Sequence, residues 1–324
     1  MDAAPASRRD ETLDAARGLA VLLMVWVHFV PDDGPWTSVW AFDALPAAMF
    51  TMLVGVSAAA GGERNLRAVV RRAASLVLLG LPFWVWVWPN DILIPIACML
   101  PVVALLRGRP QVTWLVLSAL LGAVPWATAS WGGFAWTEIR ADGTHEANHS
   151  LGMHTLRYFV LHGAYPLLPW LAFPLLGLRL GRARWSRRAL CAWLVVGLVA
   201  MLAALVCDRW GDAEAGGVAA HLDVTWQPTS LPFVLLWGGA ACASIASLYL
   251  LRLRSRILAV VGRWSLQHYL AHLVLVFWPL TIWWPDEDWS WALGASVATG
   301  YIAVACLAAT RRSGRRCLRE NHHG

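Results

Sequence analysis

A small group of ionisable side chains lies inside long apolar stretches of the sequence: His28, Asp43, His162, His268 and His272. An ionisable group inside a bilayer is costly, so each is a candidate functional residue. A histidine beside a carboxylate can act as a general base, because the carboxylate fixes the imidazole tautomer and stabilises the imidazolium. The commoner alternative for each histidine is a buried ring that hydrogen-bonds a backbone carbonyl. The pattern makes His28 the leading functional candidate, followed by Asp43.

The spacing of these residues sets their depth. His28 follows Arg17 by eleven residues, which is about 16 Å along a helix. With Arg17 at the inner interface, His28 lies slightly past the midplane. His272 lies near the midplane of a later segment, and His268 shares its helix face at i, i+4.

Arginines cluster at the other end of the same segments. Arginine forks bind phosphate groups in a bidentate way, which makes Arg17, Arg179, Arg182 and Arg263 candidate binding residues for a phosphorylated ligand. The alternative is that they only fix the membrane topology and meet lipid headgroups. Arg17 differs from the others because Gly18 follows it and lets another chain or a ligand approach closely.

The composition predicts the elements that hold these residues. The 324-residue chain is 58% apolar and 14% charged, whereas soluble proteins carry about 25% charged residues. We therefore predict an all-α polytopic membrane protein of about ten transmembrane helices. The basic residues fall in short clusters, which argues against a nucleic-acid partner, and the cysteine spacing supports neither disulfides nor a metal site. The predicted spans are 15–31, 40–60, 73–89, 92–106, 112–131, 157–180, 189–208, 230–251, 264–284 and 290–310.

The arginines predict the orientation of these spans. With the N-terminus inside, 23 of the 26 basic residues, all of them arginines, fall in inner segments, as the positive-inside rule requires. Both termini are then cytoplasmic. We expect a disordered tail over 1–10, one transmembrane domain over 11–311 and a disordered basic tail over 312–324.

Four short motifs, in this order, resemble those of transmembrane acyltransferases. The segment 13–28 opens L-D-A-A-R-G-L-A and ends in a histidine eleven residues after its arginine. The segment 41–57 resembles the D-x-x-x-P…G-x-S stretch of the heparan-α-glucosaminide N-acetyltransferase branch. The segment 162–182 is similar to the Y-P-L-x-P-W…G-x-x-x-G-R helix of bacterial members, and 262–272 to their G-R-x-S-L-x-x-Y-x-x-H segment. One departure is the short outer loop 31–39, which lacks the lumenal segment in which the animal enzyme places its proposed histidine. His28 is therefore carried over from the wider acyltransferase pattern.

The resemblance implies an acyltransferase of the bacterial cell membrane. Cytoplasmic acyl-CoA, expected to be acetyl-CoA, would enter from the inner face, and a hydroxyl or amine acceptor such as a glycan would arrive from outside. His28, assisted by Asp43, would deprotonate the acceptor, with His272 or Tyr269 as the oxyanion donor. No metal is expected, and the oligomeric state, a homodimer included, stays open. The other residues implied are Arg17, Arg179, Arg182 and Arg263 for the donor and His162, Tyr165 and Tyr269 for the acceptor.

Two other classes of protein fit parts of the same pattern. A proton-coupled secondary transporter would also place histidines and a carboxylate in the membrane, but the sequence lacks a pair of matching broken helices in two halves. A non-catalytic membrane scaffold would not need the buried ionisable residues. The acyltransferase is therefore the preferred interpretation.

Overall fold

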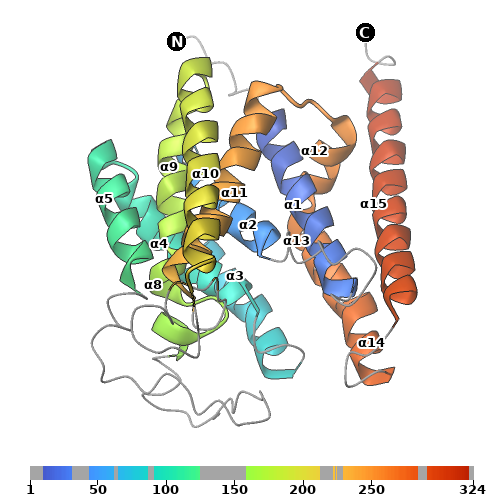
Figure 1. Cartoon of the computed structure of the whole chain (residues 1–324). Helices are drawn as coiled ribbons and strands as arrows, with labels where there is room; N and C mark the ends of the chain where they lie inside the picture. Colours follow the sequence, from blue (N-terminus) through green and yellow to red (C-terminus); the bar gives the residue numbers. More distant parts are fainter. Residues whose placement is uncertain are drawn as a thin grey trace. The chain divides into compact units, whose positions relative to one another are not determined.

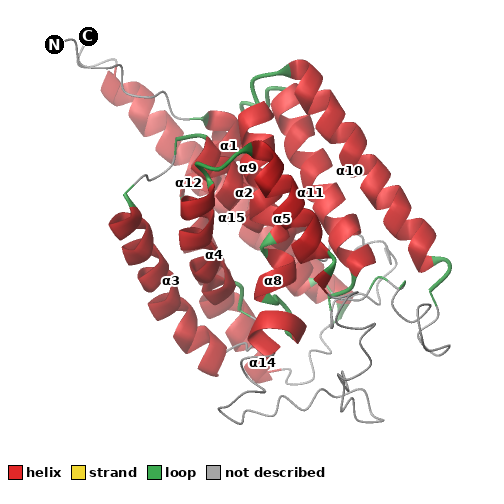
Figure 2. Cartoon of the chain, turned by 90° about the vertical axis from the view of Figure 1, so that its left-hand side faces the viewer, coloured by secondary structure: helices red, strands yellow, loops and turns green. Residues whose placement is uncertain are grey.

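The computed structural model describes residues 10–30, 44–61, 65–86, 91–124, 158–211, 222, 224, 229–283 and 290–320. Every regular element in these ranges is helical, as Figure 2 shows. The α-helices, labelled in Figure 1, are α1 (Glu11–Phe29), α2 (Leu45–Ala59), α3 (Leu66–Trp86), α4 (Leu93–Leu106), α5 (Gln111–Gly122), α8 (Leu167–Trp170), α9 (Ala172–Ala183), α10 (Arg187–Asp208), α11 (Leu231–Leu250), α12 (Arg256–Arg263), α13 (Ser265–His272), α14 (Trp278–Trp283) and α15 (Trp291–Glu320). Two π-helices, η2 (Tyr158–His162) and η4 (Leu273–Phe277), accompany them.

The helices confirm an all-α, multi-pass membrane protein. Among the described residues, α1, α3, α10, α11 and α15 are long and apolar enough to cross a bilayer. The apolar helices α2, α4 and α5 are shorter, and α4 contains Pro101 within the helix. The count of ten spans stays a prediction.

Three segments differ in detail from the predicted spans. The sixth span, 157–180, is divided into η2, α8 and α9. The ninth, 264–284, is an α-helical start, a π-helical middle and an α-helical end, formed by α13, η4 and α14. The last helix, α15, continues to Glu320 and so runs through much of the segment expected to be a tail.

Hydropathy did not predict the helix α12. It lies in the arginine-rich stretch that we assigned to an inner loop. The Ser255 hydroxyl accepts a hydrogen bond from the Leu258 amide at 3.3 Å and caps its N-terminus. Eight residues are too few to span a bilayer, so only this cap marks the helix in the sequence.

Contacts divide the chain into two compact units. The first unit comprises residues 1–50 and 247–324, and the second comprises residues 51–246. The first unit therefore joins the beginning of the chain to its end. The boundaries proposed for one transmembrane domain, 11–311, are not tested by this division.

In the first unit, α1 and α12 are in backbone contact. A Cβ added to Gly18 would lie 2.1 Å from the Leu258 carbonyl oxygen, and one added to Gly262 would lie 1.7 Å from the Asp14 carbonyl oxygen. The partner that Gly18 admits is thus the backbone of α12. Small residues allow such close crossings where lipid supplies no hydrophobic drive between helices. The helices α13 and α15 also pack on α1.

The second unit uses the same device between α2 and α9. A Cβ on Gly55 would lie 1.9 Å from the Pro174 carbonyl oxygen, and one on Gly177 would lie 2.0 Å from the Met52 carbonyl oxygen. Gly177 and Gly181, which belong to the quoted family motif, therefore form a small-x-x-x-small packing face. Their role in this unit is to bring two helices together.

Residues assigned to the cytoplasmic side contact one another within each unit. In the first unit, the Tyr249 hydroxyl is 2.9 Å from Asp10 Oδ2, and the Arg312 guanidinium lies 4.5 Å from the centroid of the Trp264 ring. In the second unit, Arg182 donates to the Arg107 carbonyl oxygen at 3.1 Å. Each pair joins two chain segments that the arginine pattern places on one side of the membrane, as the proposed alternation requires.

Cysteine labelling tests this orientation. In a variant without native cysteines, Gly108→Cys in the α4–α5 turn should resist a membrane-impermeant maleimide in intact cells and react after lysis. Gly211→Cys, just after α10, should react in intact cells. Both positions lie outside the helices, and a Cβ on Gly108 meets nothing within 4 Å. The opposite labelling pattern would reverse the proposed topology.

Candidate active site

The structure brings His28 and His272 together in the first unit. His28 lies in the last turn of α1 and His272 at the end of α13. The His28 Nδ1 atom is 2.8 Å from His272 Nε2, and the two rings stack with centroids 5.0 Å apart. His28 is partly exposed, whereas His272 is fully buried. Two histidines that are 244 residues apart thus form a hydrogen-bonded pair.

Backbone chemistry fixes the direction of this hydrogen bond. The second nitrogen of His272, Nδ1, lies 3.1 Å from the carbonyl oxygen of His268. A carbonyl only accepts, so His272 Nδ1 carries a proton and, in the neutral ring, Nε2 is an acceptor. His28 Nδ1 must then donate to it. In the neutral pair, the unprotonated nitrogen of His28 is therefore Nε2, the form required of a base.

Aromatic rings surround the buried histidine. Tyr269 lies one turn earlier on the same helix, with its ring centroid 5.4 Å from that of His272. Phe29 approaches from α1, edge-on at 6.2 Å. The candidate residue Tyr269 is itself buried. These rings restrict the rotation of His272 and keep it in the plane that faces His28.

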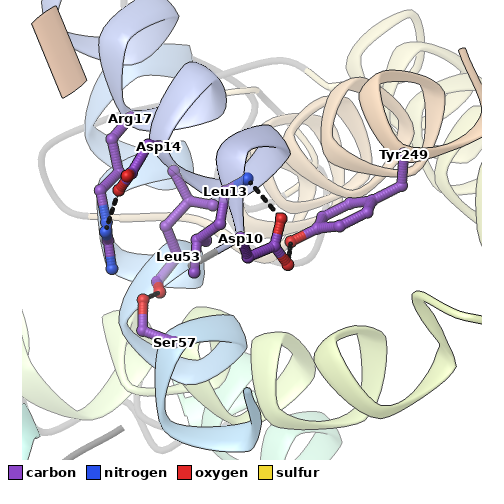
Figure 3. Close-up of polar contacts among 7 residues, drawn as sticks. All are labelled: Asp10, Leu13, Asp14, Arg17, Leu53, Ser57 and Tyr249. Carbon is purple, nitrogen blue, oxygen red and sulfur yellow. Dashed lines mark hydrogen bonds and ion pairs between the residues drawn. The ribbon is translucent and has the colours of Figure 1, made fainter. Parts of the chain in front are cut away.

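The arginine of the first motif is held near the start of α1. Figure 3 shows Arg17 Nη1 paired with Asp14 Oδ1 at 3.0 Å, one turn apart. Asp14 is 2% exposed and the Arg17 side chain 26%. Asp10 caps the helix by accepting from the Leu13 amide at 3.1 Å. The guanidinium is thus positioned by a buried carboxylate at the end of α1 assigned to the cytoplasm.

The other candidate arginines differ in their surroundings. In the second unit, Arg182 lies 4.8 Å from the centroid of the Trp114 ring, and its other contact is the Arg107 carbonyl. These contacts give Arg182 a structural task at the ends of α4 and α5. Arg179 is partly exposed on α9. Arg263 is partly exposed at the end of α12, in the first unit.

The candidate acceptor residues of the second unit adjoin an aromatic cluster. The Tyr165 ring lies 4.8 Å from that of the buried Trp170, which also contacts Phe173 and Phe233. The Trp170 indole N–H is buried and has no hydrogen-bond partner among the described residues. Such a donor is unusual in a folded core.

Two candidates are not defined by the structure. Asp43 lies outside the described residues. His162 belongs to η2, but the structure gives no description of its side chain. The proposed carboxylate and one proposed acceptor residue therefore stay predictions.

Two features of the site were missed by the sequence patterns. The Tyr301 hydroxyl of α15 bonds the backbone of His268, and no motif pointed to it. The π-helix η4 begins directly after His272, and η2 ends at His162. A π-segment inserts one residue per turn and often lies at functional sites. Its apolar sequence, L-V-L-V-F in η4, carries no recognisable signal.

The fold is that of a multi-pass membrane protein, and its first unit contains a hydrogen-bonded pair of histidines. Residues 9–206, more than half of the chain, match the family model described as heparan-alpha-glucosaminide N-acetyltransferase, catalytic. The chain belongs to this family of membrane acetyltransferases, whose acyl donor is acetyl-CoA. No curated protein matches the chain. The match includes Arg17 and His28 and ends before His272, so the partner of His28 lies in the part of the chain beyond it.

Proposed function

We propose that this protein transfers an acetyl group from cytoplasmic acetyl-CoA to an extracytoplasmic hydroxyl or amine, such as that of a glycan, in the bacterial cell membrane. The observation that carries the proposal is the hydrogen bond from His28 Nδ1 to His272 Nε2. It gives a base of defined tautomer on a helix whose other end carries an ion-paired arginine. Family membership supports the reaction type.

During the transfer, one proton moves from the acceptor to His28 and then to the leaving CoA thiolate. His28 Nε2 takes the proton of the acceptor O–H or N–H while the acceptor atom attacks the thioester carbonyl carbon. The tetrahedral intermediate then collapses, the C–S bond breaks, and His28 Nε2 gives the acceptor's proton to the CoA thiolate. His272 Nε2 stabilises the transient imidazolium by accepting from Nδ1.

This arrangement changes the role we propose for His272. Both of its ring nitrogens are engaged, one with His28 and one with the His268 carbonyl. It therefore orients the base and does not donate to the oxyanion, for which Tyr269 is the other candidate. His272 also takes the place at Nδ1 that a carboxylate fills in a histidine–carboxylate pair. The assistance that Asp43 is expected to give His28 stays part of the proposal.

Acceptor binding is proposed for His162 and Tyr165. Tyr165 is partly exposed and lies beside an aromatic cluster whose Trp170 indole N–H has no hydrogen-bond partner among the described residues. A tyrosine ring with its hydroxyl suits a ligand that is apolar on one face and carries hydroxyls. This chemistry supports a sugar-like acceptor.

The same hydrogen bonds count against a proton-coupled transporter. On the His272 side, the hydrogen bond from Nδ1 leads to a backbone carbonyl oxygen, which cannot pass a proton to a further group. A relay needs a titratable residue at each step. The described residues of the site therefore suit a general base that passes the acceptor's proton to the leaving thiolate.

Acetyl transfer by the purified protein tests the proposal. The protein in lipid nanodiscs is given radiolabelled acetyl-CoA with glucosamine-terminated saccharides or simple amines and alcohols. We expect CoA release that depends on the acceptor and labelled product that the His28→Ala variant does not form. Absence of acetyl-CoA binding, together with proton-coupled uptake in proteoliposomes, would contradict the enzyme and favour the transporter.

A donor-binding variant tests the role of Arg17. Arg17→Gln should weaken acetyl-CoA binding about tenfold, because a charge-assisted contact to phosphate contributes more than a neutral one. Acetyl-pantetheine has the same thioester but lacks the nucleotide phosphates, and its turnover should be unaffected. Equal losses with both donors would show that Arg17 acts on the fold and not on the phosphates.

A further inference from the structure

A tyrosine outside every recognised motif is joined to the histidine pair. Tyr301, on α15, donates its hydroxyl to the backbone carbonyl oxygen of His268 at 3.0 Å. Its oxygen lies 3.2 Å from the His268 ring nitrogen Nδ1, so that this nitrogen donates in return. The same carbonyl oxygen accepts from His272 Nδ1. One carbonyl thus receives two side-chain donors, from α13 and from α15.

This carbonyl determines how His272 is held. The hydrogen bond to it fixes the His272 tautomer, and that tautomer fixes the direction of the bond from His28. The helix changes at this point from α to π geometry, since η4 begins at Leu273. The backbone hydrogen bonds change register at this junction, so they are less regular than those of a continuous α-helix. A hydrogen bond from a side chain of a neighbouring helix therefore stabilises the backbone more here than in the middle of a continuous α-helix.

The neighbouring helix is well placed to provide this support. Helix α15 packs on both α1 and α12 in the first unit. Tyr301 is partly exposed, and its ring meets that of His268 edge-on with centroids 6.1 Å apart. The tyrosine therefore connects α13 to a helix that also packs on α1, which carries His28.

We infer that Tyr301 is a positioning residue, which acts through His268 and His272 to hold His28 Nε2 in the reactive orientation. The inference rests on the proposed function, because it assigns Nε2 the role of base. It adds a third helix to the site and places two of the three helices, α13 and α15, beyond the residues that match the family. Tyr301 touches neither the acyl group nor the acceptor in this scheme.

Kinetics of Tyr301→Phe in two backgrounds test the inference. The phenylalanine keeps the ring and removes the hydroxyl. We expect kcat to fall about 3- to 10-fold, the effect of one hydrogen bond, with KM for acetyl-CoA unchanged. In a His272→Gln background, whose amide oxygen can still accept from His28, the same change should have no further effect, because its route through His272 Nδ1 is gone.

A second tyrosine provides the matched control. Tyr249→Phe, in the same unit, also removes one hydroxyl, the one bonded to Asp10. Any effect of this variant should be the same in both backgrounds. If Tyr301→Phe behaves in the same way, or leaves kcat unchanged in the wild type, the positioning role is wrong.

Nitrogen NMR tests the network without any assay of activity. In protein labelled with ¹⁵N-histidine and assigned through the single variants, His28 and His272 should show Nδ1–H tautomers. Tyr301→Phe should shift both signals, and Tyr249→Phe should leave them in place. Unchanged His28 and His272 signals in Tyr301→Phe would overturn the inference. If the wild type transferred no acetyl group while these shifts appeared, the proposed function would fail and the hydrogen-bond network would stand.

Discussion

Replacement of His28 by alanine is expected to lower the rate of acetyl transfer about 10²- to 10⁴-fold, the usual contribution of a positioned general base. The reason is local. His28 Nε2 is the unprotonated nitrogen of the neutral pair, because Nδ1 donates to His272. Without it, the acceptor must lose its proton to water or attack while still protonated. Single-turnover measurements with saturating acetyl-CoA report this step directly.

The affinity for acetyl-CoA and the thermal midpoint are the controls for this variant. Arg17 lies eleven residues from His28 on α1, so donor binding should change less than twofold. His28→Gln is a second test, since its amide can hydrogen-bond but cannot accept a proton at neutral pH. A variant that keeps near wild-type transfer, with normal stability, would remove His28 from the chemistry.

Much of the helix arrangement follows from the sequence because lipid imposes simple rules. Each segment in lipid must satisfy the hydrogen bonds of its own backbone, so the length of an apolar stretch predicts a helix. The placement of arginines predicts the orientation of these helices. The positions of α10 and α11 agree with the spans predicted there, and α3 and α15 overlap theirs. These rules did not predict the helix α12, because it is short and basic. Its existence depends on a Ser255 cap and on contact with α1.

The sequence predicted how deep in the membrane the candidate site residues lie, but not which way their side chains point. Rise per residue places His28 and His272 at similar heights, and the motifs suggested that both matter. Whether two side chains at one height face each other depends on how the helices rotate and cross. That crossing is set by Gly18 and Gly262, which are far apart in the sequence. The contribution of Tyr301 depends on the same packing, because no local pattern couples it to His268.

The second large effect is expected from Gly262→Ala, which should lower the thermal midpoint strongly or prevent folding. An added Cβ would lie 1.7 Å from the Asp14 carbonyl oxygen and 2.7 Å from the Gly18 amide nitrogen. Both atoms are backbone, so no side chain can rotate away and the helices must separate. Overpacking of this kind costs about 1–3 kcal/mol, and more where backbone must move. Detergent-solubilised protein can be compared by thermal unfolding and size-exclusion chromatography.

Gly300→Ala supplies the matched control, because the same substitution on α15 meets nothing within 4 Å. Alanine exceeds glycine in helix propensity by about 1 kcal/mol, so this variant should be as stable as the wild type or more so. Gly262→Ala should differ in a second way. Only Trp264 separates α12 from α13, so a displaced α12 also moves His272 away from His28. Folded Gly262→Ala protein should therefore bind acetyl-CoA but transfer its acetyl group slowly. If it matched Gly300→Ala in stability and rate, the α1–α12 contact would not be what aligns the two histidines.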